Sequence, residues 1–401
     1  MLCRFTTPLN KKNVKTGKEL MRSIVTFLIV IMSTTYSFAV DTKELNSSFT
    51  FKPKGTLRLD YLGMTNNRLN VGDRFYFRDV LIGGKGQILH DFDYRFDINV
   101  MSDVYNRIQQ AYVEYKKYDP VSIKVGRIFH AFFLDYDRSF NEWPAIGALV
   151  IQVKDGVQIK THGGNWSMTG SYGMSETVHN NKNADRRNSL YAQATYSPYY
   201  NEKKQEYLHL GFANSYIMPK ESLKYKIKPE ANADISLLNT GTINLVNNAF
   251  TTSVAAAYNN KAFSTQVEYL GYHMDRAMAQ PNLFFHGGYV QVGYFLTGES
   301  KTYSPNKGKI EPITPLDPVF TFRNHKKVGI GAWEIAVKYS VVNLNSKTKF
   351  GKLLTYGVGL NWYLNDNIKL SNDFLISRTD RFAAVPNSIS KIVLARLQIE
   401  F

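Results

Sequence analysis

The stretch Val393-Leu394-Ala395-Arg396-Leu397-Gln398-Ile399-Glu400-Phe401 ends the chain. Every second residue in it, from Val393 to Phe401, is apolar, and the residues between are mostly polar. Because side chains point to alternate faces of a β-strand, this spacing predicts a strand with one apolar face and an aromatic residue at its end. A single strand does not define a fold, so the significance of the pattern depends on how often it recurs upstream.

A second alternating stretch, 92–100, has a more polar opposite face. One face would carry Phe92, Tyr94, Phe96, Ile98 and Val100, and the other would carry Asp93, Arg95, Asp97 and Asn99. Four strongly polar side chains cannot all face a packed core without costly pairing. They can face a water-filled channel if the apolar face contacts lipid, which is the alternation of a transmembrane β-barrel.

Stretches of this kind recur along the chain, and we count roughly sixteen of them. Further clear examples are 121–125, 166–174, 208–212, 333–341 and 354–364. Tight polar turns alternate with longer loops, and the long loops are 127–154, 176–188, 228–248 and 299–326. An up-and-down barrel produces this alternation. The sequence therefore predicts an all-β protein, a transmembrane antiparallel β-barrel of about 16 strands with no second domain.

The first 39 residues have the order of a secretory signal: basic residues, an apolar stretch from Ile24 to about Met32, and small residues around Ala39. We expect cleavage after Ala39, which would leave residues 40–401 as the outer-membrane barrel. A membrane anchor is the alternative, but the apolar stretch is far shorter than the ~20 residues that a spanning helix needs. Met21 is an alternative start, since Met21-Arg22-Ser23 would give a normal short basic region.

Charge and cysteine content follow from this cleavage. The chain has a net charge of +16, and its first 39 residues carry six basic residues and one acidic residue, so the exported part would carry +11. No nucleic-acid partner is expected for an exported barrel, and the charge has a simpler use in drawing anions inward. The one cysteine, Cys3, lies in the removed segment, so neither disulfides nor thiol chemistry are expected.

The segment from Arg127 to Lys154 is too aromatic for a freely solvated loop. Its aromatic residues include Phe129, Phe132, Phe133, Phe140 and Trp143. We interpret it as a loop folded into the barrel lumen. There it would narrow the pore and present Arg127 and Arg138, with nearby aspartates, to the permeating solute. The alternative is an extracellular loop packed on a neighbouring subunit.

Three lysines alternate in Leu223-Lys224-Tyr225-Lys226-Ile227-Lys228-Pro229. In an extended chain they would share one face at intervals of about 6.5–7 Å. Their mutual repulsion costs about 0.6 kcal/mol per neighbouring pair in water and about 2 kcal/mol at an effective dielectric of 20. Lys224, Lys226 and Lys228 therefore favour a partner anion in a confined space. A surface loop in which water and salt screen the charges is the alternative.

From Gly287 onward the chain resembles the phosphate-selective porin O/P family. The resemblance is carried by Tyr294-Phe295-Leu296-Thr297-Gly298-Glu299-Ser300, by Gly331-Ala332-Trp333-Glu334, by Gly359-Leu360-Asn361-Trp362-Tyr363-Leu364-Asn365 and by the terminal aromatic strand. The amino-terminal half is similar more loosely, for example at Phe75-Tyr76-Phe77-Arg78. The resemblance implies a sixteen-stranded trimeric porin of the bacterial outer membrane. It also implies a loop folded into the lumen and a ladder of basic residues that leads anions to the constriction.

The same resemblance bears on the site residues. The three lysines fall where the family places part of its ladder, and Arg78 falls where phosphate-selective members have two consecutive arginines. Here Asp79 follows Arg78, Arg138 stands close to the basic position of the folded loop, and Glu230 interrupts the basic series. Lysine holds phosphate as a point charge, whereas arginine would offer a bidentate fork. A general anion or small-solute preference is therefore expected over a strict phosphate filter.

The expected function is that of an outer-membrane porin for passive diffusion of small, preferentially anionic solutes, with phosphate among the candidates. The residues expected along the anion path are Lys224, Lys226, Lys228, Arg78, Arg127 and Arg138. We expect no cofactor, metal or catalytic residue, and the expected partners are outer-membrane lipid, small anions and further copies of the chain in a homotrimer.

Two other classes stay open at this point. One is an outer-membrane barrel enzyme, which needs a nucleophile with a base and an orienting partner. The eight histidines are scattered and form no recognisable motif of that kind. The other is a structural or adhesive barrel that conducts nothing, and such a barrel would have a plugged lumen.

Overall fold

A computed structural model of the chain describes residues 49–102, 107–128, 132, 134, 139–150, 155–177, 185–219, 222–320 and 329–401. The chain divides into two units, residues 1–49 and residues 50–401, and all strands named below belong to the second unit. The predicted signal segment, residues 1–39, lies outside the described residues.

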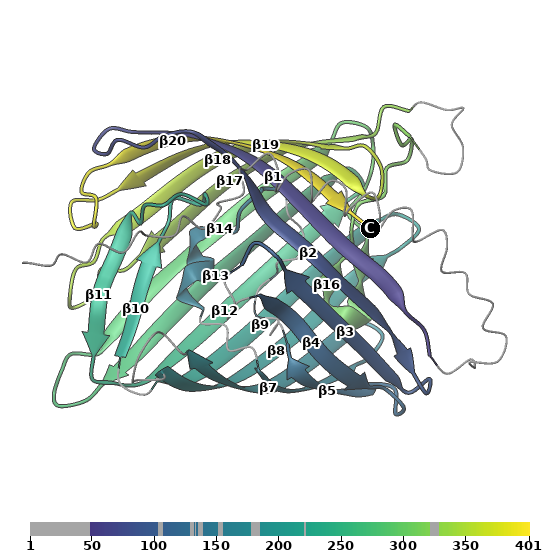
Figure 1. Ribbon diagram of the computed structural model, residues 1–401, viewed down its shortest axis with the longest axis horizontal. Coiled ribbons are helices and arrows are strands. Elements are labelled where there is room, and N and C mark those ends of the chain that lie inside the picture. The colour runs from purple at the N-terminus through teal and green to yellow at the C-terminus, as the bar shows by residue number, and fades with distance from the viewer. Residues whose placement is uncertain are drawn as a thin grey trace, which may run out of the picture. The chain divides into compact units, whose positions relative to one another are not determined.

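Sixteen strands of the second unit close into an antiparallel β-barrel (Figure 1). In barrel order they are β1 (Lys52–Asn66), β2 (Arg74–Ile88), β3 (Phe92–Asn99), β4 (Ile108–Tyr115), β5 (Val121–Arg127), β6 (Asp155–His162), β7 (Trp166–Thr177), β8 (Asp185–Asn201), β9 (Glu206–Met218), β12 (Val246–Asn260), β13 (Phe263–Arg276), β14 (Leu283–Phe295), β17 (Ala332–Asn343), β18 (Lys352–Tyr363), β19 (Ile368–Thr379) and β20 (Ile389–Glu400). β20 pairs with β1 along residues 56–66, which closes the sheet. Closure removes free edges, as a lipid environment requires. The prediction of an all-β antiparallel barrel of about 16 strands is confirmed.

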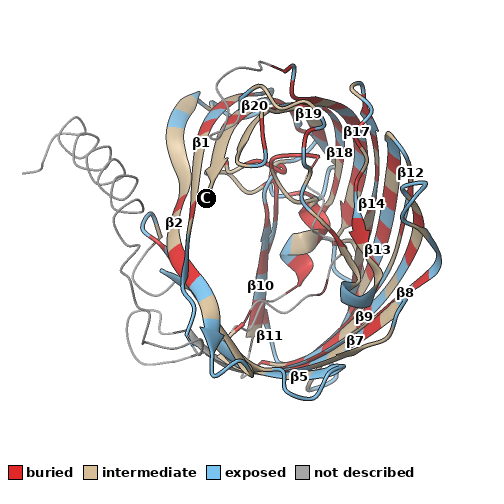
Figure 2. Cartoon of the chain, turned by 90° about the vertical axis from the view of Figure 1, so that its right-hand side faces the viewer, coloured by how far each residue is buried: buried red, intermediate tan, exposed pale blue. Residues whose placement is uncertain are grey.

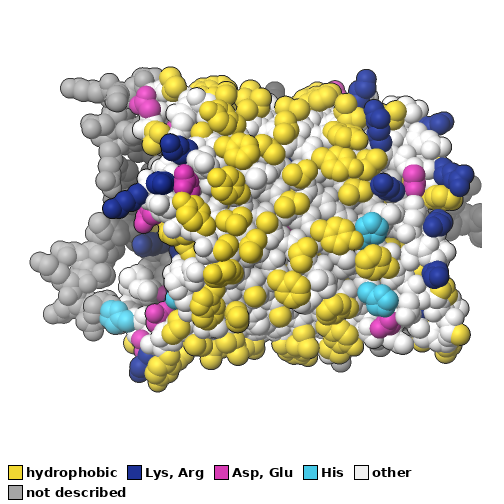
Figure 3. All heavy atoms as spheres, turned by 180° about the vertical axis from the view of Figure 1, so that it is seen from behind, with side chains coloured by type: hydrophobic (Ala, Val, Ile, Leu, Met, Phe, Trp, Pro, Cys, Tyr) yellow, Lys and Arg dark blue, Asp and Glu magenta, His cyan; other side chains and the backbone are white. Residues whose placement is uncertain are grey.

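The outer face of the barrel is apolar and the inner face is polar. On β17, Ile335, Val337 and Tyr339 are exposed, whereas Glu334 and Lys338, on the opposite face of the strand, are buried. Figure 3 shows apolar side chains over the middle of the outer face, with lysines and arginines towards its two ends. A polar interior and an apolar exterior invert the arrangement of a water-soluble protein and suit a barrel that spans the outer membrane.

The two alternating stretches that led to this prediction are both barrel strands. On β3, Phe96 is 39% exposed and Asp97 is 7% exposed. On β20, Val393 is 45% exposed and Arg396 is 5% exposed. Arg95 donates a 2.6 Å hydrogen bond to Asp97, so charges on the lumen wall balance one another. The period of two therefore assigned the correct faces to both strands.

The connections between strands form two sets at the two ends of the barrel. At one end most are short turns, such as 89–91, 163–165 and 364–367. The connection 296–331 belongs to this end by its place in the strand order, yet it is long. The predicted alternation of long loops and tight turns is therefore wrong here. The predicted loop 176–188 is also shorter than expected, since β7 and β8 extend into it.

The described part of the long connection at the short-turn end folds back against the barrel wall. It contains β15 (Tyr303–Ser304), the 3-10 turn η2 (Pro305–Lys307) and β16 (Lys309–Ile310). Its Lys301 lies 2.9 Å from Glu334 of β17, and both side chains are almost fully buried. This buried ion pair holds the connection against the wall.

Two segments from the other end pack against the inner wall. The first contains the 3-10 turn η1 (Ala145–Leu149), and the second contains the hairpin of β10 (Ser222–Ile227) and β11 (Leu238–Asn244). Figure 2 shows β10 and β11 inside the ring of barrel strands. Their apolar side chains form one buried cluster with residues of the wall, including Ile146, Leu149, Leu223, Tyr225, Ile227, Leu238, Tyr272, Phe285 and Val342. Burying each large apolar side chain contributes about 1.5–3 kcal/mol, so this lumen cluster holds both segments in place.

Candidate functional site

Hydrogen bonds tie residues 139–150, the described part of the predicted lumen loop, to the inner barrel wall. Ser139 Oγ donates to Glu334 of β17 at 2.7 Å. The Asn141 backbone N–H donates to Asp373 of β19 at 2.8 Å. Glu334 and Asp373 are buried side chains of the inner face, so this part of the loop lies on the lumen side of the wall.

Glu142, on the same segment, lies between two arginines of the wall. Arg78 of β2 donates to both of its carboxylate oxygens, at 3.0 and 3.3 Å. Arg396 of β20 donates to Oε1 of Glu142 at 3.0 Å and also binds both oxygens of Asp60 at 2.7 Å. Burial alone would raise the pKa of the Glu142 carboxyl, but the two guanidinium groups hold its pKa below the ordinary value. Two arginines and two carboxylates therefore neutralise one another here.

Glu230 joins both inserted segments to the wall. Its Oε1 accepts hydrogen bonds from the Ala145 backbone N–H, at 2.8 Å, and from the Ser340 hydroxyl. Its Oε2 lies 2.8 Å from Lys338 Nζ of β17. The carboxylate that interrupts the basic series in the sequence is thus neutralised by Lys338, and it does not cancel the charge of the lysine run.

The lysine run has the alternation that was read from the sequence. The apolar residues of β10 are buried in the lumen cluster, whereas Lys224, Lys226 and Lys228 are exposed. In the described part of the chain, none of these three ammonium groups has a carboxylate oxygen within 4.0 Å. Their positive charges are therefore available to a dissolved anion.

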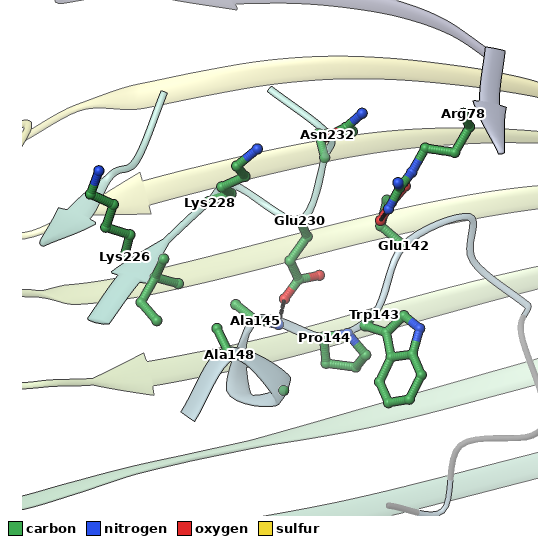
Figure 4. A pocket seen from close by; sticks show the side chains of 13 residues that line it. Arg78, Glu142, Trp143, Pro144, Ala145, Ala148, Lys226, Lys228, Glu230 and Asn232 are labelled. Atoms are coloured by element: carbon green, nitrogen blue, oxygen red, sulfur yellow. Dashed lines mark hydrogen bonds and ion pairs between the residues drawn. The ribbon is translucent and has the colours of Figure 1, made fainter. Parts of the chain in front are cut away.

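A cavity of about 550 Å³ lies beside the hairpin and the inserted loop (Figure 4). Its lining includes Arg78, Glu142, Trp143, Lys226, Lys228, Glu230 and Asn232. Three of the predicted anion-path residues, Arg78, Lys226 and Lys228, are therefore brought together. Lys224 is not among the lining residues, and Arg138 lies outside the described residues.

Arg127 does not reach this cavity. Nε and Nη2 of its guanidinium group donate to the two carboxylate oxygens of Asp155, each at 2.6 Å. The position of Arg127 at the start of the lumen loop was the basis for placing it on the anion path. The alternation of β5 places Arg127 on the outer face instead, because it follows the outward-facing Ile123 and Val125 at intervals of two residues.

A second cavity, of about 610 Å³, has a basic lining that sequence reasoning missed. Its cationic residues are Arg95, Lys116, Lys124, Lys160, Lys307 and Lys309, and its acidic residues are Glu114 and Asp119. Lys124 and Lys160 occupy the inward phase of their strands, a signal that is present in the sequence. Lys307 and Lys309 come from the connection 296–331, whose return to the wall no local pattern indicates.

The histidines supply no candidate catalytic centre in the described chain. His209 of β9 is buried and shares a 2.6 Å hydrogen bond with the Tyr303 hydroxyl, which packs the long connection against the wall. Among the described residues, no three His, Cys, Asp or Glu side chains lie close enough together to hold a metal ion. Within the same ranges, no helix has the length and apolar character needed to cross a membrane.

A closed barrel with an apolar outer face and a cation-lined lumen defines an outer-membrane porin. The chain belongs to the family described as phosphate-selective porin O and P, which matches residues 51–401. The resemblance read from the sequence motifs is thereby confirmed.

Two relatives are similar to this chain in sequence. The chain is 24% identical over 387 residues to Porin O of Pseudomonas aeruginosa, and the match covers 84% of each chain. It is 24% identical over 328 residues to an uncharacterized protein of Caulobacter vibrioides, and that match covers 75% of this chain and 63% of the relative.

Solved structures of outer-membrane proteins share the fold. The trimer form of OmpT, an outer membrane protein of Vibrio cholerae, matches with a TM-score of 0.56 at 9% identity, over 88% of this chain and 100% of that one. Pseudomonas putida OprB matches with a TM-score of 0.52 at 9% identity, over 90% of this chain and 96% of that one. At this identity the similarity concerns the barrel fold alone.

Proposed function

We propose that the protein lets small anions diffuse passively across the outer membrane, attracted by exposed lysines in the lumen. The observation that carries this proposal is the charge balance of the 550 Å³ cavity. Its two carboxylates, Glu142 and Glu230, are each paired with a cation. Lys226 and Lys228 have no carboxylate oxygen within 4.0 Å in the described chain. A dissolved anion therefore meets a net positive charge.

Conduction also requires that the solute leave again. Lysine ammonium groups are strongly hydrated point charges on flexible stems, and they hold an anion by weak, multiple contacts. At about 7 Å, one such charge attracts a monovalent anion by about 0.6 kcal/mol in water, which is close to RT. Contacts of this size raise the anion concentration in the lumen without trapping one ion.

We infer a general anion preference, with phosphate as one permeant solute, over a strict phosphate filter. The guanidinium group of Arg78 already donates hydrogen bonds to Glu142, and the other cations of the cavity lining are lysines. Phosphate enters as a hypothesis through the description of the family. Within this chain, the support concerns anions in general.

The reversal potential of the purified protein in a planar bilayer under a chloride gradient tests this function. A stable anion-selective current is the expected result, and phosphate added at millimolar concentration should reduce it only weakly. Strong block by phosphate would replace the general preference with a phosphate-specific site. A cation-selective current, or a current without preference, would overturn the anion-porin proposal.

We also propose that three copies of the chain assemble into a trimer. Strands β3 to β6 contain only 7 or 8 residues each, whereas β7 to β9 contain 12 to 17. At about 3.4 Å per residue and a tilt near 45°, 8 residues rise about 19 Å, less than the apolar band of ~25 Å. Contact with a second copy over β3 to β6 would cover this deficit. Light scattering in detergent should give three times the chain mass, and a monomer mass would contradict the proposal.

The same bilayer recording distinguishes a porin from two other classes of protein, a barrel enzyme and a structural or adhesive barrel. A barrel enzyme would need a nucleophile, a base and an orienting group in one place. A structural or adhesive barrel would have a closed lumen, whereas the proposed porin has two cavities with cationic linings. Absence of any current from correctly folded protein would favour these classes over a porin.

The amino-terminal segment is the part of the chain that we propose is removed on export. We expect the exported protein to begin at residue 40, after removal of residues 1–39. Intact-mass measurement of protein extracted from the outer membrane tests this, and a mass that includes residues 1–39 would contradict it.

A further inference from the structure

We propose that Glu142 is an internal counter-ion that occupies an anion-binding position between Arg78 and Arg396 and thereby sets how strongly phosphate binds in the lumen. This inference rests on the proposed anion-porin function and names a specificity-determining residue for it. It explains how a member of a phosphate-selective family would keep two arginines at the lumen wall and still hold phosphate weakly.

The carboxylate of Glu142 takes the place that a dissolved oxyanion would take. Two N–H groups of Arg78 point at its two oxygens, at 3.0 and 3.3 Å, and one N–H group of Arg396 reaches Oε1 at 3.0 Å. Forked contacts of this kind are the geometry by which arginine holds carboxylate and phosphate alike. An anion that approaches Arg78 must therefore compete with a carboxylate of the same chain.

The position is accessible from the pore. Arg78 is 32% exposed and lines the same cavity as Lys226 and Lys228. Figure 4 shows Arg78 and Glu142 together on one side of the view and the two lysines on the other. Arg396 is the deeper partner, since its side chain is 5% exposed and is already paired with Asp60. A phosphate ion at Arg78 would thus stand in the pathway and not in a closed pocket.

The inserted loop has anchors that do not depend on Glu142. The Asn141 backbone N–H is held by Asp373, and the Asn141 carbonyl oxygen accepts a hydrogen bond from Arg396 at 2.6 Å. On the other side, the Ala145 backbone N–H is held by Glu230. These bonds fix the backbone at Asn141 and at Ala145, on either side of Glu142. The position of the loop therefore does not depend on this carboxylate alone, and the carboxylate can also serve selectivity.

The net charge of the residues around Glu142 determines how a substitution there would change phosphate binding. With Glu142 ionised, the group formed by Arg78, Arg396, Asp60 and Glu142 has a formal charge of zero. Replacing Glu142 by glutamine keeps the shape of the side chain and raises this charge to +1. The Arg78 guanidinium, released from Glu142, would then face the cavity together with two lysines. This arrangement would attract a multivalent anion more strongly than the wild-type cavity does.

The test compares block of chloride current by inorganic phosphate in wild-type protein, Glu142→Gln and Glu202→Gln. Glu202 is an exposed residue of the turn between β8 and β9, so its substitution makes the same charge change away from the cavity. We expect the phosphate concentration for half-block to fall about tenfold or more in Glu142→Gln and to stay unchanged in Glu202→Gln. An unchanged value in both variants, with anion selectivity intact, overturns this inference but leaves the anion-porin function standing.

A second variant keeps the proposal testable if Glu142→Gln does not form channels. Glu142→Asp preserves the charge that pairs with Arg396 but shortens the side chain by one methylene group, which loosens its hold on Arg78. The half-blocking concentration should fall in the same direction by a smaller factor. Wild-type phosphate block in a conducting Glu142→Asp channel overturns the inference. Absence of an anion preference in the wild-type protein would instead overturn the proposed function itself.

Discussion

The ammonium group of Lys338 lies 2.8 Å from a carboxylate oxygen of Glu230, and the two side chains are 1% and 0% exposed. Lys338 belongs to β17 of the barrel wall, and Glu230 follows the lysine run of the hairpin segment. The second oxygen of Glu230 accepts the backbone N–H of Ala145 in the other inserted segment. One buried ion pair therefore joins the wall and both segments that pack against its inner face.

Removing one partner of this pair should destabilise the barrel strongly. Lys338→Met would leave the Glu230 carboxylate buried without a counter-ion, which costs about 3–5 kcal/mol. The double variant Glu230→Leu with Lys338→Met should cost much less, because neither charge is then left alone. Urea-induced unfolding in detergent measures both values.

The exposed pair of Lys307 and Glu311 provides the matched comparison. Its atoms are 3.3 Å apart, but the Lys307 side chain is 59% exposed. Glu311→Gln should therefore change the free energy of unfolding by no more than about 1 kcal/mol. An equal loss of stability in Glu311→Gln and Lys338→Met would contradict the importance of burial in this prediction.

Reversing the lysine run should reverse or abolish anion preference while the barrel stays folded. Replacing one ammonium group by a carboxylate changes the energy of a monovalent anion about 7 Å away by roughly 1.2 kcal/mol in water, or several-fold in its local concentration. Lys224→Glu, Lys226→Glu and Lys228→Glu in one variant should therefore shift the reversal potential in a chloride gradient towards cation selectivity.

Two lysines of an exposed turn serve as the control for net charge. Lys203→Glu with Lys204→Glu alters the turn between β8 and β9 and should leave the reversal potential nearly unchanged. Wild-type selectivity in a folded triple variant of the run would exclude Lys224, Lys226 and Lys228 from the anion path.

Gly308 should be essential to the packing of the long connection 296–331. Its φ of 62° is left-handed, and a methyl group at this position would lie 2.3 Å from Oγ1 of Thr195 on β8. Gly308→Ala should cost about 1–2 kcal/mol for the backbone and about 1–3 kcal/mol more for the overlap. Gly298 also has a positive φ, of 92°, but open space around it, so Gly298→Ala should show the backbone cost alone. Equal unfolding free energies for the two variants would contradict this prediction.

The ion pairs of Glu142 should make part of the stability dependent on pH. Burial disfavours its charged form, but the two arginines outweigh this effect and lower the pKa of the folded state. A lowered pKa means that the stabilisation is complete above the ordinary glutamate pKa of about 4.3 and is lost as the pH falls through the lower folded value. The difference in unfolding free energy between wild-type protein and Glu142→Gln should therefore be constant near neutral pH and shrink in acid. A difference that does not vary between pH 7 and pH 3 would contradict it.

The barrel itself could be derived from the sequence because strand faces are a local property. Residues two positions apart share a face, and residues one or three positions apart lie on opposite faces. Phe96 and Asp97, and likewise Val393 and Arg396, therefore show the lipid and lumen sides without knowledge of any partner strand. The same rule placed Lys224, Lys226 and Lys228 on one exposed face. Applied to β5, it places Arg127 on the same face as Ile123 and Val125.

The pairing of charges inside the lumen depended on the tertiary structure. Arg78 and Glu142 are 64 positions apart, and Asp60 and Arg396 are 336 positions apart. They meet because the sheet closes and two segments fold into it, and no spacing within a strand or loop encodes that distance. The sequence alone therefore determined the strands, their lipid and lumen faces, and the excess of positive charge. Only the folded barrel decided which of those charges are neutralised by buried partners and which are left for a solute. A neutralising contact needs two groups within a few ångströms of each other, and the separation of two residues along the chain does not show whether they are that close.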